Sequence, residues 1–314
     1  MRVCLMIEGQ EGVSWSDWLA LGQAAEESGL EGLFRSDHYS GQSDDARGSL
    51  DAWTQIAALA AVTDRIRLGT LVSPVTFRHP SLLAKAVATA DHVSEGRVEL
   101  GIGTGWMEQE HTAYGFPFPP MAERLELLEE QLEIIVRQWT EESLDFRGRH
   151  YRLDGLRSRP TPFQQPRPPV IVGGSARPRT ARLAARFADE YNTVYPSDEE
   201  LRERRANVLR ACIDAGREPL TFSVMTGCVV GRDTAELHER VERLLAKTGR
   251  EGDPAEFVRT QRGRLVLGTV EQVRDRLREL EALGVQRIFL QHLVHEDVEM
   301  VRLLGNEVAP AVRA

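Results

Sequence analysis

Lysine is nearly absent from this chain of 314 residues, which has 37 arginines but only two lysines, Lys85 and Lys247. Lysine and arginine together number 39 against 48 aspartates and glutamates, so the formal charge is −9. The sequence also has no long basic run. An acidic chain without a basic patch is poorly suited to nucleic acids and anionic membranes, so we expect neither as a partner.

Cysteine and long apolar runs are scarce too. The three cysteines, Cys4, Cys212 and Cys228, form no CxxC pair, so neither a zinc knuckle nor a disulfide framework is predicted. Reduced thiols fit a cytoplasmic protein best. No apolar run approaches the roughly 18 residues of a membrane helix, and the N-terminal segment is too short for a signal-peptide core. We therefore expect a cytoplasmic protein.

Short β-branched runs alternate with longer amphipathic runs along the chain. Eight runs have the composition of strands: 3–7, 32–36, 66–72, 98–102, 170–172, 190–194, 221–230 and 286–290. Most are followed by a helical run, and the last run, 295–312, is expected to be one closing helix. Strands alternating with helices predict a parallel sheet, and eight of them favour a (β/α)₈ barrel over a doubly wound sheet.

No low-complexity linker divides the sequence. We predict one barrel domain over 1–314, with insertions near 103–120, 144–169 and 248–264. The second insertion is rich in proline and is expected to contain a small hairpin. In such a barrel, binding and catalytic residues lie at the carboxyl ends of the strands, which narrows the search for a site.

Two strand ends carry acidic or titratable side chains. The second strand ends in Asp37 and His38, and an Asp-His pair can transfer protons, since histidine titrates near neutrality and a carboxylate orients it. An ordinary turn explains the pair equally well. Glu8 ends the first strand and would point into the barrel mouth, either as a substrate ligand or as a structural group.

Two other strand ends are rich in glycine. Gly101, Gly103 and Gly105 would let a ligand approach the backbone closely. They half-match a dinucleotide or methyltransferase loop, but they follow three βα units and no acidic ribose ligand comes after them. Gly173 and Gly174 precede a helix, so their N–H groups could cradle a phosphate, although a tight turn also favours glycine.

Three long segments, together with SDHY at 36–39, resemble the luciferase-like monooxygenase superfamily. They are RLGTLVSPVTFRHPSLLAKAVATADHVSEGRVELGIGTGWMEQEHTAYGFPF, PPVIVGGSARPRTARLAARFADEYN and LGTVEQVRDRLRELEALGVQRIFLQ. The sequence looks most similar to the branch that depends on coenzyme F420, a deazaflavin, and less similar to the FMN enzymes. The resemblance implies a bacterial luciferase-like barrel, a cofactor in its mouth, a small-molecule substrate and a homodimer.

The resemblance also assigns roles to strand-end residues. A bulge in the third strand, with a non-prolyl cis peptide behind the cofactor ring, would fall at Leu71-Val72, with Val72-Ser73 as the alternative. Asp37 would contact the polar edge of the ring. His38 would be the catalytic residue beside the carbon that exchanges the hydride. Further cofactor contacts are implied for Thr104, Gly105, Gly173, Gly174, Ser175 and Asn192.

One position departs from the F420-dependent sugar-phosphate dehydrogenases. Trp106 stands where they carry a catalytic glutamate, so Glu110 is the candidate to replace that acid, and Trp106 and Glu8 are expected to face the substrate. The two lysines are also too few to supply a phosphate site of that kind. Glu110 and His111 resemble half of a metal site, but HExxH spacing is absent, so no metal is predicted.

Three functions follow as hypotheses. The first is an F420-dependent oxidoreductase that moves a hydride between the deazaflavin and a small organic molecule, with His38 exchanging the proton. The second is an FMN-dependent monooxygenase on the same fold. The third is a flavin- or F420-binding protein without catalytic activity.

Overall fold

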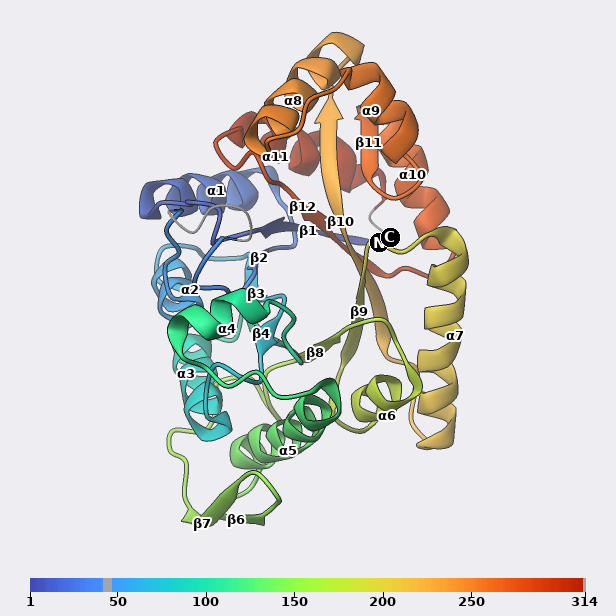
Figure 1. Cartoon of the computed structure of the whole chain (residues 1–314). Coiled ribbons are helices and arrows are strands. Elements are labelled where there is room, and N and C mark those ends of the chain that lie inside the picture. The colour runs from blue at the N-terminus through green and yellow to red at the C-terminus, as the bar shows by residue number, and fades with distance from the viewer. Residues whose placement is uncertain (42–46, 313–314) are drawn as a thin grey trace.

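Eight parallel strands close into a barrel in the computed structural model, which describes residues 1–41 and 47–312 (Figure 1). They are β1 (Arg2–Ile7), β2 (Gly32–Arg35), β3 (Arg67–Thr70), β5 (Val98–Gly103), β8 (Val170–Gly173), β9 (Glu190–Val194), β10 (Thr221–Gly231) and β12 (Arg287–Gln291). The strands pair in that order, and β12 pairs with β1 to complete the ring. The predicted (β/α)₈ barrel is confirmed.

Helices surround the barrel on the outside (Figure 1). They are α1 (Trp15–Ser28), α2 (Ala52–Ala60), α3 (Pro80–Val93), α5 (Met121–Thr140), α6 (Pro178–Phe187), α7 (Asp198–Asp214), α8 (Thr234–Lys247), α10 (Val270–Ala282) and α11 (Val298–Leu303). Local sequence sets their ends: Ser14 and Asp17 form a capping box at the start of α1, and Gly29 ends it in the left-handed conformation.

The single closing helix expected over 295–312 is wrong. The α-helix ends at Leu303 and continues as a π-helical turn over 304–308 and a 3₁₀ turn over 309–311. Gly305 packs directly against Ser28 of α1, so the helix changes its winding where it meets that neighbour. Pro310 then removes a backbone donor.

The three predicted insertions contain their own short elements. The first holds α4 (Glu108–Tyr114), and the second holds the expected antiparallel hairpin, β6 (Leu144–Arg147) and β7 (Arg152–Leu156). The third holds α9 (Pro254–Gln261) and is followed by a strand that the sequence did not predict, β11 (Val266–Thr269). β11 pairs with the outer half of β10. The assignment of the whole chain to one domain stays a prediction.

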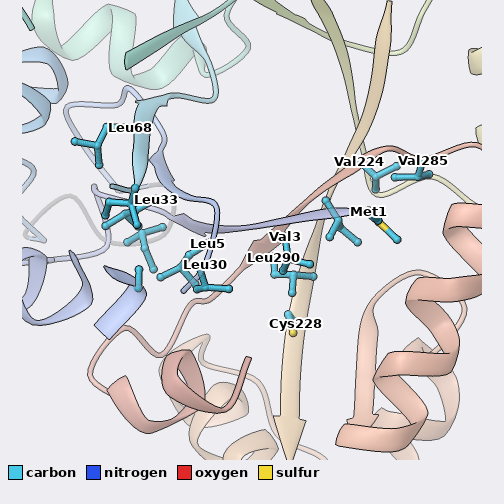
Figure 2. Packing of buried hydrophobic residues seen from close by; sticks show 14 of the residues in the cluster. Met1, Val3, Leu5, Leu30, Leu33, Leu68, Val224, Cys228, Val285 and Leu290 are labelled. Carbon is cyan, nitrogen blue, oxygen red and sulfur yellow. The ribbon is translucent and has the colours of Figure 1, made fainter. Parts of the chain in front are cut away.

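The barrel interior is layered. At the amino ends of the strands Arg287 lies between the carboxylates of Glu99 and Glu190, at 2.6 and 3.1 Å. Above this ionic layer Phe34 and Phe289 pack edge to face, with ring centres 4.9 Å apart. A larger apolar core fills the space between strands and helices, and Figure 2 shows part of it. The carboxyl ends of the strands are thus left as the open end.

No helix of the described ranges is both long and apolar enough to cross a membrane.

Candidate active site

A cavity of about 730 Å³ opens at the carboxyl ends of the strands. This volume suits a cofactor or drug-sized ligand, for which pockets of about 300–1,000 Å³ are typical. Ten of the residues expected at the site line it: Glu8, His38, Leu71, Val72, Thr104, Gly105, Trp106, Gly173, Gly174 and Asn192. Four do not line it: Asp37, Ser73, Glu110 and Ser175.

His38 lines the cavity and is also hydrogen-bonded to a buried carboxylate. Its Nδ1 lies 2.8 Å from Oε2 of Glu110, whose other oxygen accepts the backbone N–H groups of Tyr39 and Ser40. A carboxylate only accepts, so Nδ1 is the protonated nitrogen and Nε2 is left for a ligand. Burial alone would lower the pKa of His38, but the hydrogen bond and charge of Glu110 outweigh it and raise that pKa.

Glu110 itself has a different place from the one expected. It is fully buried in α4, behind His38, and does not reach the cavity. Burial would raise its pKa, but the hydrogen bond and charge of His38 and the two backbone N–H groups lower it. A catalytic role for Glu110 stays a prediction. Among the described residues its carboxylate is hydrogen-bonded to His38 and to the adjoining backbone, so such a role would have to act through the histidine.

The wall opposite β12 is built around a backbone bulge. The peptide bond between Leu71 and Val72 is cis, so of the two positions expected for the cis bond it is the first that is found. After it, β4 (Ser73–Pro74) pairs with β5 and restores the wall. The side chain of Val72 is part of the cavity lining, as expected for a residue behind a bound ring.

The glycines of β5 and β8 have a role that the sequence did not reveal. A Cβ on Gly103 would lie 2.8 Å from Cγ2 of Val72, and one on Gly173 would lie 2.9 Å from Cγ1. These glycines therefore form a notch, the Val72 notch, that seats a protein side chain. The approach of a ligand to these glycines stays a prediction, and the seating of Val72 is a second reason for the absence of a side chain. Gly105 has a left-handed backbone conformation, with φ of +76°, which glycine adopts without steric cost.

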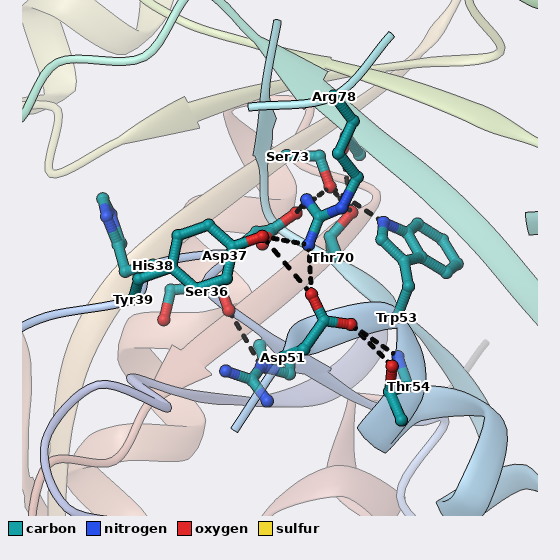
Figure 3. Close-up of polar contacts among 12 residues, drawn as sticks. Ser36, Asp37, His38, Tyr39, Asp51, Trp53, Thr54, Thr70, Ser73 and Arg78 are labelled. Carbon is teal, nitrogen blue, oxygen red and sulfur yellow. Dashed lines mark hydrogen bonds and ion pairs between the residues drawn. The ribbon is translucent and has the colours of Figure 1, made fainter. Parts of the chain in front are cut away.

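Asp37 and Ser73 stand behind the bulge. Oδ2 of Asp37 accepts hydrogen bonds from Oγ of Ser73 at 2.5 Å and from Arg78 at 2.6 Å. Figure 3 shows Arg78 bridging Asp37 to Asp51, the N-cap of α2. Oδ1 of Asp37 is buried without a hydrogen-bond partner among the described residues. A buried acceptor of this kind is a candidate contact for a cofactor donor.

The turn between β8 and α6 offers fewer free donors than expected for a phosphate cradle. The N–H of Gly174 donates to the carbonyl of Asn192 at 3.0 Å, and that of Ala176 donates to the hydroxyl of Tyr191 at 2.8 Å. Ser175 is exposed beside them. A phosphate here would depend on the N–H and hydroxyl of Ser175 and on the positive end of α6.

Sequence reasoning missed a chain of hydrogen bonds along the opposite wall. The hydroxyl of Tyr195 donates to Gln291, and Gln291 and Gln10 each donate to the carboxylate of Glu8. Gln291 is the last residue of β12 and Tyr195 follows β9, so the strand-end rule could have found both. Three cations of the lining, Arg47, Lys247 and Arg250, come from loops and a helix end, where no sequence signal marks them.

The described residues hold no group of three or more His, Cys, Asp or Glu side chains placed to bind a metal ion.

A family model described as luciferase-like monooxygenase matches residues 3–287. The chain belongs to this family of enzymes.

Particular relatives differ in the cofactor that their names give. The F420-dependent glucose-6-phosphate dehydrogenase of Microbacterium testaceum is 30% identical over 95% of this chain and 94% of its own length. The FMNH(2)-dependent dimethylsulfone monooxygenase of Pseudomonas putida is 28% identical over 82% of this chain and 77% of its own length. A solved F420-dependent secondary alcohol dehydrogenase has the same fold, with a TM-score of 0.85 at 20% identity over 100% of this chain and 99% of its own.

Proposed function

We propose that the protein is an F420-dependent oxidoreductase that moves a hydride between the deazaflavin and a small organic substrate. The observation that carries the proposal is His38, held at Nδ1 by buried Glu110 and reaching the cavity beside the bulge at Val72. Family membership and the similarity to an F420-dependent dehydrogenase support it. A homodimer in the cytoplasm is part of the same proposal.

The residues present fit the cofactor. Val72 offers an apolar face against which a planar ring can pack. Outside the cavity lining, Oδ1 of Asp37 is a buried acceptor without a hydrogen-bond partner among the described residues. Ser175 and the first turn of α6 would face the phosphate. Bound F420 supplies a carbon that accepts or releases a hydride, which no amino-acid side chain can do.

His38 supplies the proton step. In the oxidation of an alcohol, for which the bound cofactor would supply the hydride acceptor, Nε2 of His38 would accept the hydroxyl proton as the alcohol becomes a carbonyl. Glu110 stabilises the imidazolium that forms, because its carboxylate accepts the Nδ1–H bond at 2.8 Å. In the reverse direction the same imidazolium donates the proton.

The second candidate is an FMN-dependent monooxygenase, supported by the similarity to the dimethylsulfone enzyme. Equilibrium binding of F420 and FMN to the purified protein, followed by tryptophan fluorescence, separates the two. Trp106 is 58% exposed at the cavity and its ring lies 5.6 Å from that of His38, so it should report a bound ring. Saturable quenching by F420 with little response to FMN is expected; preference for FMN would favour the second candidate, and binding of neither would refute both.

A further inference from the structure

Three cations line one side of the cavity, and at first sight they form an anion site. Lys247 and Arg250 belong to the end of α8 and the segment after it, and Arg47 precedes α2. They share this side with Glu8 of the β1 end and with Gln291 of β12, which lies across the barrel from β5. The Val72 notch is on the β5 side. The cationic side is therefore the one left for the substrate when a cofactor ring packs on Val72.

The ammonium of Lys247 is already engaged. It donates to both carboxylate oxygens of Glu296, at 2.7 and 2.8 Å, and lies 3.1 Å from Nδ1 of His295. An ammonium has three N–H bonds, and these contacts use all three. His295 is almost fully buried, so it holds the lysine from a fixed position. Lys247 has no donor left for a substrate anion.

Arg47 is engaged in the same way. Its Nη1 donates to Glu11 at 2.5 Å, and its Nη2 donates to the carbonyl of Lys247 at 3.2 Å. Arg250 is exposed and takes part in none of the ion pairs found among the described residues. Glu8 and Glu11 both belong to the cavity lining. A phosphate entering this side would meet Arg250, but it would also meet these two carboxylates, which oppose it by like-charge repulsion.

We infer that Glu296 is a specificity-determining residue: it occupies Lys247, so the cavity takes an uncharged alcohol or carbonyl compound and disfavours sugar phosphates. The inference rests on the proposed function for the reaction, but the binding of phosphate can be measured independently of that reaction. Glu296 is outside the cavity lining and half exposed, and Lys247 is mostly buried. Removal of the Glu296 charge should therefore free the ammonium without disturbing the wall.

The test compares Glu296→Gln with the unchanged protein, each carrying F420. Dissociation constants for glucose 6-phosphate and for glucose are measured by calorimetry. Glu299→Gln is the matched control, because Glu299 also pairs with a cation, Arg302 of α11, and neither residue lines the cavity. Binding of F420 to each protein is measured first, so a failure of the cofactor proposal is seen separately. The comparison of variants is then repeated on the cofactor-free proteins, so phosphate binding is also tested without F420.

We expect the unchanged protein to bind glucose 6-phosphate no better than glucose. Glu296→Gln should bind the phosphate at least about fivefold more tightly, which is the effect of about 1 kcal/mol from one partly exposed charge pair. Glu299→Gln should not change. Tight phosphate binding by the unchanged protein that Lys247→Ala abolishes would overturn the inference. So would the absence of any gain in Glu296→Gln, or an equal gain in the control.

Discussion

The Val72 notch predicts that one methyl group on the barrel wall should weaken cofactor binding. In Gly103→Ala the new Cβ would lie 2.8 Å from Cγ2 of Val72, whereas ordinary contacts begin at 3.4 Å. Val72 must therefore move by at least about 0.6 Å, the difference between these distances. Gly173 closes the notch from the other side, so the free direction is into the cavity.

The displaced side chain would occupy space that the cofactor ring needs. Overpacking typically costs about 1–3 kcal/mol, which corresponds to a roughly 5- to 150-fold increase in the dissociation constant of F420. Thermal unfolding of the cofactor-free protein should change little, because the cavity accommodates the shift. Fluorescence titration and a melting curve measure the two effects.

Val72→Ala in the Gly103→Ala background is the decisive variant. It removes Cγ2, the atom that clashes with the new Cβ, so it should recover affinity relative to Gly103→Ala. Gly263→Ala is the control, since a Cβ there meets nothing within 4 Å. Normal affinity in Gly103→Ala, or a further loss in the double variant, would refute the account of the notch.

Three further predictions concern His38 and the ionic layer. The pKa of His38 is raised, so the rate of alcohol oxidation should increase with pH through a pKa above the ordinary value of about 6.5, and the rate of carbonyl reduction should decrease. Steady-state rates measured across pH check this. A change of rate centred below about 6.5 would contradict it. In Glu110→Gln the amide nitrogen would face Nδ1 of His38 and leave Nε2 protonated. We therefore expect kcat to fall about 100-fold or more while the dissociation constant of F420 stays unchanged. An equal loss of turnover and of F420 affinity would indicate a structural role alone. Arg287→Leu should lose about 3 kcal/mol or more of unfolding free energy at pH 7, because Glu99 and Glu190 stay buried without their shared cation. Burial raises the pKa of Glu99, but Arg287 and Arg67 outweigh it and lower that pKa to about 2. The contribution of Glu99 to the free energy of unfolding is therefore fully present above its unfolded pKa and decreases toward pH 2. Denaturation curves should show the smallest difference in unfolding free energy between Arg287→Leu and the unchanged protein in acid.

Much of the fold could be predicted from the sequence because its determinants are local. Each barrel strand is a short apolar run, and caps such as Ser14 and Gly29 are set by neighbouring residues. β11 was not predicted, because its pairing depends on the outer half of β10, more than thirty residues earlier. The change of winding was not predicted either, and it occurs where Gly305 packs against Ser28, from the other end of the chain.

The site divides in the same way. The sequence by itself determined which strand ends carry His38, Asp37, Val72 and the glycines, since strand ends are set by local pattern. Only the tertiary structure decided what these residues touch. It placed Glu110 behind His38, seated Val72 on Gly103, and engaged Lys247 with Glu296, because such contacts join positions that only closure of the barrel brings together.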